Sequence, residues 1–280
     1  MTGPHRIVVG EGVQALAFAA GALDFTVLVD RSLDIGPLSW RGTKVGWESS
    51  TGFRHPAGHD PHADEGRGFN RLFSGFLVTG GLEHIRQPKD GHPLHGSLPF
   101  TPAKLTGSGE ADGVLFCEGE VSQPGFRLKR RIEAPVGGNS LTLTDVVENL
   151  AATPQHQASL YHFNIGRPTL ADGTVVKQGT ERRLGPLRVP DPTMTSESAG
   201  FLGPASCTVE TPTCTITFDW DGVTLSHLQL WHRLNADPPV LSIEPCTSER
   251  LPGGLSGEEP TLAPGETRRY RLQVSFTTSS

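Results

Sequence analysis

Residues 140–147 read SLTLTDVV, and the apolar residues Leu141, Leu143 and Val147 share one parity. Side chains of one parity lie on one face of a β-strand, so this stretch predicts a half-buried strand. The same two-residue period recurs along the chain, and turn-forming groups such as GSG at 107–109 and PVGGN at 135–139 separate the repeats. Further strands of this kind are predicted at 23–29 (LDFTVLV), 126–132 (FRLKRRI), 214–220 (CTITFDW) and 270–276 (YRLQVSF).

The composition favours many short strands and frequent turns. The 280 residues include 34 glycines and 23 prolines, which are spread along the chain and not gathered in one tract. No pattern of an amphipathic helix of ten or more residues is present. Because no change in composition marks a boundary, the sequence predicts one all-β domain over residues 1–280, a sandwich or a barrel.

Charge and hydrophobicity limit the partners that we expect. The formal net charge is −6, and the longest basic run, 129–131, lies inside an alternating stretch where a solvated strand face explains it. A nucleic-acid partner is therefore disfavoured. The longest apolar stretch, 16–29, contains Asp24 and is too short to span a bilayer. With no signal-peptide pattern and no C-x-x-C pair, we expect a cytoplasmic protein without membrane partners, and the sequence leaves open whether it forms a homodimer.

The segment 53–70 is polar and without periodicity, which predicts a long loop of the kind that often binds ligands. The motifs of the commonest hydrolases, kinases and nicotinamide-dependent enzymes, G-x-S-x-G, the P-loop and G-x-G-x-x-G, do not occur in the sequence.

Four short segments carry polar residues that a strand-rich core does not require. On a strand, His162 and Asn164 would share one face, and so would Gln229 and Trp231. Imidazole, amide, indole and a carboxylate on one concave sheet would suit a sugar, because planar polar groups hold hydroxyls while an aromatic face packs on C–H groups. Each residue taken alone also has a structural explanation in the core, and His232, of opposite parity, is expected at the surface. The segments are GHPLHG at 91–96, YHFNIGRP at 161–168, LQLWHR at 228–233 and LSIEP at 241–245.

The order of these segments resembles the aldose 1-epimerase (galactose mutarotase-like) superfamily, and above all its branch known as domain of unknown function 4432. The resemblance extends from about residue 12 to the C-terminus and implies the β-supersandwich fold with a concave ligand-binding face. It rests on DRSLDIG at 30–36, WRG at 40–42, TGGL at 79–82, HPLHG at 92–96, YHFNIG at 161–166, SIEP at 242–245 and LAPGE at 262–266 followed by Tyr270.

The resemblance implies a cofactor-independent isomerase that acts on the anomeric centre of a sugar. Glu244 would be the base that takes the anomeric hydroxyl proton, and His162 would be the acid that protonates the ring oxygen. His95 would contact the sugar near that oxygen. Arg71 and Arg86 compete for the position of the family's sugar-binding arginine, and the Asn-Arg context favours Arg71.

The sequence departs from the family pattern in two places. Phe163 directly follows His162, where mutarotases have a proline and a tyrosine before the phenylalanine. The aspartate with which mutarotases hold their substrate has no clear counterpart. Both departures weaken an expectation of activity on galactose itself.

Two other functions remain open at this point. One is a metal-dependent sugar isomerase or epimerase that works through an enediol. The other is a carbohydrate-binding protein without turnover. Ligands for a metal would come from His84, His92 and His95, or from the loop residues His55, His59 and His62 with Asp60 and Asp64.

Overall fold

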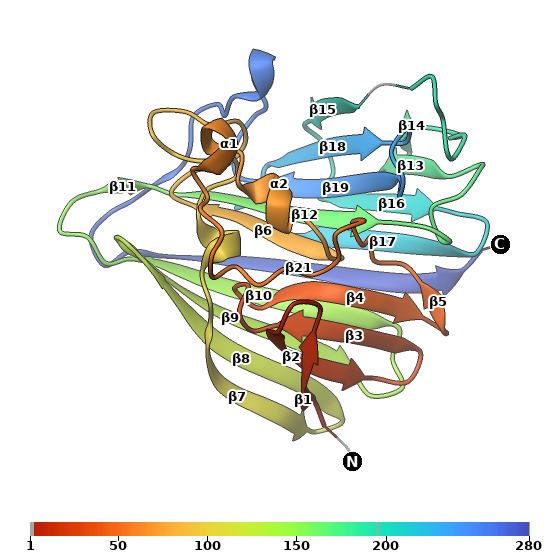
Figure 1. The fold of residues 1–280 in the computed structure, drawn as a ribbon, viewed down its shortest axis with the longest axis horizontal. Helices are drawn as coiled ribbons and strands as arrows, with labels where there is room; N and C mark the ends of the chain where they lie inside the picture. The colour runs from red at the N-terminus through yellow and green to blue at the C-terminus, as the bar shows by residue number, and fades with distance from the viewer. Residues whose placement is uncertain (1–2, 195, 280) are drawn as a thin grey trace.

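The computed structural model describes residues 3–194 and 196–279, and most of its strands form two large antiparallel sheets (Figure 1). The predicted all-β fold is confirmed, and each stretch with a two-residue period is a strand or part of one. These strands are β3 (Leu23–Leu28), β9 (Phe126–Pro135), β10 (Ser140–Asn149), β17 (Cys214–Trp220) and β21 (Thr267–Thr278).

The first sheet carries the site described below. Its strand order is β1-β2-β3-β4-β6-β12-β19-β18-β15, with β5 paired to β4. Besides β3, its strands are β1 (His5–Val9), β2 (Val13–Ala19), β4 (Asp34–Trp40), β5 (Thr43–Lys44), β6 (Leu77–Leu82), β12 (Ala158–Ile165), β15 (Glu197–Phe201), β18 (His227–Arg233) and β19 (Val240–Cys246).

The second sheet has the order β14-β13-β16-β17-β21-β10-β9-β8-β7, and a separate two-stranded sheet joins β11 to β20. The strands not yet given are β7 (Lys104–Ala111), β8 (Val114–Gln123), β11 (Gln155–His156), β13 (Val175–Gln178), β14 (Glu181–Leu184), β16 (Ser206–Glu210) and β20 (Thr261–Leu262).

Helical structure in the described residues is limited to single turns. The segment predicted as a long loop contains α1 (Ala63–Gly66) and the start of α2 (Phe69–Leu72), and both turns lie over β6 and β12 (Figure 1). The 3-10 turns are η1 (Leu98–Phe100) and η2 (Pro252–Gly254). None of these helical segments has the length or the apolar character needed to cross a membrane.

Burial differs between the two sheets. In β10 half-buried and buried side chains alternate, because one face packs on the core and the other faces solvent. In β6, β12 and β19 every residue is buried. One face of these strands packs on the core between the sheets, and loops cover much of the other face. The main apolar core includes Cys117, Cys207 and Cys214, and Cys246 packs in a smaller cluster; all four are buried free thiols.

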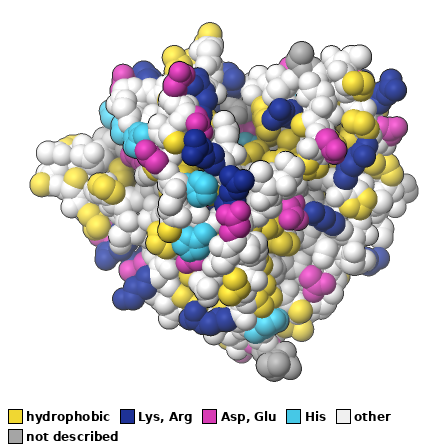
Figure 2. Space-filling view, viewed as in Figure 1, with side chains coloured by type: hydrophobic (Ala, Val, Ile, Leu, Met, Phe, Trp, Pro, Cys, Tyr) yellow, Lys and Arg dark blue, Asp and Glu magenta, His cyan; other side chains and the backbone are white. Residues whose placement is uncertain are grey.

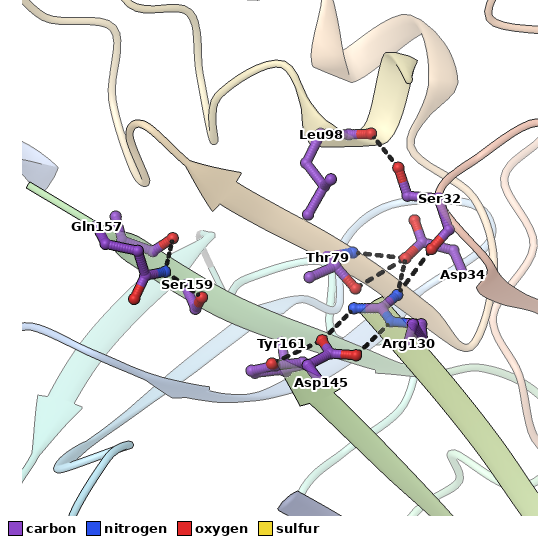
Figure 3. Close-up of polar contacts among 10 residues, drawn as sticks. Ser32, Asp34, Thr79, Leu98, Arg130, Asp145, Gln157, Ser159 and Tyr161 are labelled. Carbon is purple, nitrogen blue, oxygen red and sulfur yellow. Dashed lines mark hydrogen bonds and ion pairs between the residues drawn. The ribbon is translucent and has the colours of Figure 1, made fainter. Parts of the chain in front are cut away.

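A polar cluster joins the two sheets inside this core (Figure 3). Arg130 on β9 donates two hydrogen bonds to Asp145 on β10, from Nε to Oδ1 at 2.8 Å and from Nη2 to Oδ2 at 2.7 Å. Tyr161 on β12 donates its hydroxyl proton to Asp145 Oδ2 at 2.8 Å. Arg130 Nη1 also lies 3.3 Å from Asp34 Oδ1 on β4. The second sheet is thereby tied to two strands of the first.

The buried position of Arg130 corrects one expectation. The basic run at 129–131 was assigned to a solvated strand face, yet Arg130 is 1% exposed. Alternation places Lys129 and Arg131 outward and Arg130 inward, where it meets the inward-facing Asp145. Arg130, a charged residue at an inward-facing position of the strand, therefore indicates a buried ion pair and not an interruption of the strand.

Candidate active site

Three neighbouring strands of the first sheet bring the predicted residues together. His162 lies on β12, Glu244 on β19, and Gln229 and Trp231 on β18, and the strand order is β12-β19-β18. Gln229 is directly opposite Glu244 in the antiparallel register, so their side chains share a face.

These side chains line a cavity of about 230 Å³ on the face of the sheet that points away from the core. His95, His162 and Glu244 do reach a single hollow, as the sequence predicted. The cavity is lined by Arg67, Phe69, Asn70, Phe73, Arg86, Gln87, Leu94, His95, His162, Ser198, Gln229, Trp231, Glu244, Arg250 and Gly254.

His95 comes from a loop that packs tightly on β6, and the glycines of the TGGL motif allow this approach. A Cβ atom on Gly80 would lie 3.1 Å from both the Cβ and the carbonyl oxygen of His95. Gly81 has φ of +126°, and its N–H donates to the His95 carbonyl at 2.9 Å. The motif therefore sets the distance between the loop and the strand.

Hydrogen bonds fix the tautomer of His162. Asn164 Nδ2 donates to the Gly75 carbonyl at 3.0 Å, and Ser242 Oγ donates to Asn164 Oδ1 at 2.8 Å. The amide oxygen of Asn164 therefore faces His162 Nδ1, 2.6 Å away, and Nδ1 must carry the proton. In the neutral imidazole, Nε2 then presents its lone pair, and it lies 3.3 Å from Glu244 Oε1.

A second chain of hydrogen bonds orients Glu244. The guanidinium of Arg86 can only donate, and its Nη1 donates to Gln229 Oε1. Gln229 must therefore turn its Nε2 toward Glu244, where it donates to Oε2. Oε2 is thus an acceptor, while Oε1 is buried without a hydrogen-bond partner other than the neighbouring His162 ring. A proton on the carboxyl group would sit on Oε1, facing the lone pair of His162.

Burial shifts the pKa values of this pair in opposite directions. It raises the pKa of Glu244 to about 8, although the charge of Arg86 and the hydrogen bond from Gln229 act against the shift. It lowers the pKa of His162 to about 3, with the hydrogen bond to Asn164 opposing. At neutral pH one proton is therefore shared between the Glu244 carboxyl group and His162 Nε2, and in the resting state it is on Glu244.

His95 has the opposite tautomer. The backbone N–H of Arg86 donates to His95 Nδ1 at 3.1 Å, so Nδ1 is an acceptor and the ring proton is on Nε2. Burial lowers the pKa of His95 well below its ordinary value, and the charges of His162 and Arg86 lower it further. His95 is therefore a neutral donor toward the cavity, while His162 is an acceptor.

Aromatic rings cover the two imidazoles and explain their burial. Phe73, next to α2, meets the His162 ring edge-on with centroids 4.8 Å apart, and Phe69 lies 4.9 Å from His95. Trp231 is 5.7 Å from His162 and 5.8 Å from Phe73, so both of these rings pack beside the imidazole of His162. These rings exclude water from the imidazoles and offer apolar faces to a ligand.

Comparison with known proteins places the chain in a family. The model of a family described as domain of unknown function 4432 (DUF4432) matches residues 10–186. The chain belongs to the DUF4432 family. The matched segment includes His95 and His162, while Gln229 and Glu244 lie beyond it. No match is found among curated proteins.

Solved structures show that this DUF4432 chain has the galactose mutarotase-like fold. A Klebsiella pneumoniae protein, described provisionally as an aldose 1-epimerase, has a TM-score of 0.86 at 20% identity over 99% of this chain and 84% of its own. A galactose mutarotase-like protein from Clostridium acetobutylicum has a TM-score of 0.71 at 13% identity, with 98% of each chain covered. Galactose 1-epimerase from Lactobacillus acidophilus has a TM-score of 0.61 at 10% identity, with 99% of each chain covered.

The DUF4432 structure reverses the order of preference between the two candidate arginines. Arg86 lines the cavity, whereas Arg71 is outside it and donates two hydrogen bonds of 2.7 Å to Asp64 on the molecular surface. The Asn-Arg context was misleading, because the neighbour Asn70 faces the cavity while the Arg71 side chain turns toward solvent.

Two other expectations change as well. Asn164 shares the face of His162 as predicted, but it is completely buried outside the cavity lining and holds the imidazole instead of contacting a ligand. His232 was expected at the surface and is 3% exposed. On this strand the parity opposite to the cavity points into the core between the sheets, not into solvent.

Several lining residues were not identified from the sequence. Arg67, Phe69 and Asn70 belong to the segment 53–70, whose length and polarity did predict a binding loop. Arg250 and Ser198 lie in or near strand ends with no local pattern that would distinguish them.

The residues proposed as alternative metal ligands do not converge. His84 and His92 stack with ring centroids 5.6 Å apart, but His84 Nε2 is bonded to the Gln87 carbonyl and His95 Nδ1 to a backbone N–H. In the loop, His55 pairs with Asp30 and not with the other loop histidines. Over residues 3–194 and 196–279, no three His, Cys, Asp or Glu side chains are grouped so that they could hold a metal ion.

Proposed function

We propose that this DUF4432 protein is an isomerase of the aldose 1-epimerase type, which interconverts the anomers of a sugar. One observation carries the proposal: Glu244 Oε1 and His162 Nε2 face each other at 3.3 Å at the cavity wall, one as donor and the other as acceptor. The anomeric hydroxyl and the ring oxygen are bonded to the same carbon. A donor and an acceptor this close can therefore serve both oxygens at once.

The reaction that follows conserves protons at each step. His162 Nε2 takes the proton of the anomeric hydroxyl while Glu244 gives its proton to the ring oxygen. The bond between C1 and the ring oxygen breaks, and C1 becomes an aldehyde carbon. After rotation about the C1–C2 bond, the ring oxygen returns its proton to Glu244, His162 returns its proton to the former carbonyl oxygen, and the other anomer forms.

These roles are the reverse of those implied by the resemblance, in which Glu244 is the base and His162 the acid. The total number of protons is the same in both assignments. Burial raises the pKa of Glu244 and lowers that of His162, and both shifts favour the resting form with a neutral imidazole. The hydrogen bond from Nδ1 to Asn164 leaves the Nε2 lone pair of this form facing Glu244. The ion pair of imidazolium and carboxylate then exists only while the sugar ring is open, and the short separation stabilises it.

Other groups of the cavity would bind and orient the sugar. His95 Nε2 can donate to a ring substituent, and Gln229 keeps the carboxyl group of Glu244 in place. Phe73 and Trp231 offer apolar surfaces to the C–H face of the sugar. The scheme requires no cofactor.

Proton NMR exchange spectroscopy on a panel of aldoses tests this function. We expect exchange between the α and β anomeric signals above the spontaneous rate, without deuterium uptake at C2, because the scheme never breaks the C2–H bond. Deuterium uptake at C2 would instead indicate an enediol, and binding without exchange would indicate a carbohydrate-binding protein.

Variants assign the roles. Glu244→Gln and His162→Asn should each lower the exchange rate by on the order of a hundredfold or more. Matched controls are Glu133→Gln on β9 of the second sheet and His232→Gln on the core face of β18, neither of which lines the cavity. A normal rate in Glu244→Gln or in His162→Asn would reject the role given to that residue.

A further inference from the structure

The charge of the cavity bears on the kind of sugar that it accepts. Its lining holds three guanidinium groups, from Arg67, Arg86 and Arg250, and one carboxyl group, from Glu244. The whole chain has a net charge of −6, so this cationic lining differs from the average of the molecule. Figure 2 shows the molecule hollowed in this region, with Lys and Arg side chains beside the hollow.

Two of these arginines, Arg86 and Arg250, lie close to each other, and the carboxyl groups of Glu244 and Glu259 near them do not form ion pairs with them. Burial lowers the pKa of Arg250, and the charge of Arg86 lowers it further, while Glu244 acts in the opposite direction. Among the described residues, neither Arg86 nor Arg250 forms an ion pair within 4.0 Å. Holding like charges together in a partly dry cavity costs free energy unless a ligand supplies the opposite charge.

The hydrogen-bonding capacity of these arginines is also incomplete. Arg86 is 3% exposed, and its Nε is buried without a partner. Arg250, which lines the cavity, donates from Nη1 to the Leu251 carbonyl at 3.3 Å, and its other N–H groups have no hydrogen-bond acceptor among the described residues. Gly254 lies against this guanidinium, since a Cβ atom there would come within 3.1 Å of Arg250 Nη2.

From these observations we propose that the cavity takes anionic sugars, in which a phosphate or carboxylate group binds to Arg250 with Arg67 and Arg86 nearby. The inference rests on the proposed function for the placement of the anomeric carbon at Glu244 and His162. A planar guanidinium can give two parallel hydrogen bonds to either kind of anion, so the shared chemistry is an oxyanion on the sugar. The Glu244 carboxyl group, protonated at neutral pH, would add no repulsion.

Isothermal titration calorimetry with matched sugars tests the proposal. The probes are D-glucose, D-glucose 6-phosphate and D-glucuronate, and the corresponding galactose series, with wild-type protein and with Glu244→Gln. We expect at least one anionic member to bind about tenfold or more tightly than its neutral counterpart, with affinity that falls as salt is added. The phosphate and carboxylate arms distinguish the two sources of the anion.

Variants locate the anion. Arg250→Gln should remove most of the preference for the anionic sugar, Arg250→Lys should retain part of it, and the exposed Arg67→Gln gives a smaller loss without risk to the fold. Arg269→Gln, on the exposed face of β21, is the matched control and should change nothing. The proposal is overturned if no anionic sugar binds more tightly than its neutral partner, or if Arg250→Gln weakens both equally.

The outcomes separate this proposal from the proposed function. Tight binding of an anionic sugar without anomeric exchange in the wild type would retain the anion site and reject the isomerase. Anomeric exchange together with equal affinity for neutral and anionic sugars would retain the isomerase and reject the anion site.

Discussion

Tyr161 and His162 are neighbours on β12, and they show two different uses of buried polar groups. Tyr161 points into the core, where it donates to Asp145 in the cluster with Arg130. His162 points to the opposite face, where it meets Glu244 at the cavity wall. Both side chains are buried, at 1% and 4% exposure.

The Arg130–Asp145 pair in the core and the groups at the cavity differ in how completely their atoms are paired, although Asp34 Oδ2, in the same core cluster, is buried without a hydrogen-bond partner. Every nitrogen of the Arg130 guanidinium and both oxygens of Asp145 have hydrogen-bond partners inside the protein. On the cavity side, only one carboxyl oxygen of Glu244 accepts a conventional hydrogen bond, and the Nε–H of Arg86 has no acceptor. Complete pairing stabilises a fold, whereas incomplete pairing at a cavity leaves atoms for a ligand.

The largest expected effect comes from breaking the core cluster. Arg130→Met leaves Asp145 buried without its counter-charge and Asp34 with Arg31 alone, and the free energy of unfolding should fall by about 3–5 kcal/mol. Urea denaturation measures the loss. Arg269→Met on the exposed face of β21 should change stability by less than about 0.5 kcal/mol. A small loss for Arg130→Met would show that the cluster does not hold the sheets together.

Glu244→Gln should have the opposite effect on stability, although it removes activity. The folded pKa of about 8 lies above the ordinary value of 4.5, so the folded protein retains a proton that the unfolded chain has lost. The contribution of Glu244 to stability is present below about pH 4.5 and is lost as the pH rises through 8.

We therefore expect the variant to match the wild type near pH 4 and to exceed it at pH 8 by on the order of 2–4 kcal/mol. Urea denaturation at the two pH values provides the comparison. A variant that is less stable than the wild type at pH 8 would mean that Glu244 is paired as fully as Asp145.

The rate should depend on pH through the same pair. Above a pH of about 8 Glu244 loses the proton that it donates, so kcat/KM should fall by about tenfold per pH unit. Between pH 5 and 7 the rate should be nearly constant, because the pKa of His162 is lowered to about 3. A rate that rises steadily from pH 7 to 9 would contradict the assignment of the acid.

The smallest effect is expected for Tyr161→Phe. This change removes one hydrogen bond to Asp145, which keeps both of its bonds to Arg130, so the loss should be about 1 kcal/mol. Chemical denaturation checks it, and anomeric exchange should be unaffected because the hydroxyl is on the core side of β12. A large fall in exchange would show that the two faces of the strand are coupled.

Sequence periodicity predicted the principal strands, and it grouped some of the residues that line the cavity. Parity shows which residues of one strand share a face, so it grouped Gln229 with Trp231 and His162 with Asn164, whereas Glu244 was assigned to the site by the resemblance. The resemblance also assigned His95 to the site. This residue lies on a loop, where the two-residue period of a strand does not predict the direction of a side chain.

The predictions that failed concern residues whose burial depends on which segments cover each face of the sheet. Parity could not show that Asn164 would be enclosed behind His162, or that the face opposite to Trp231 on β18 is the core that buries His232. The path of irregular segments decided between Arg71 and Arg86, and local sequence does not specify that path. Arg250 also lies on an irregular segment, so its position in the cavity lining could not be predicted from local sequence either.

The location of the shared proton is the central claim, and nitrogen-15 NMR of histidine-labelled protein at pH 7 measures it directly. His162→Asn assigns the resonances by their disappearance. We predict a neutral His162 ring with the proton on Nδ1 and a bare Nε2, next to a protonated Glu244. An imidazolium with both nitrogens protonated in the resting protein would contradict this account.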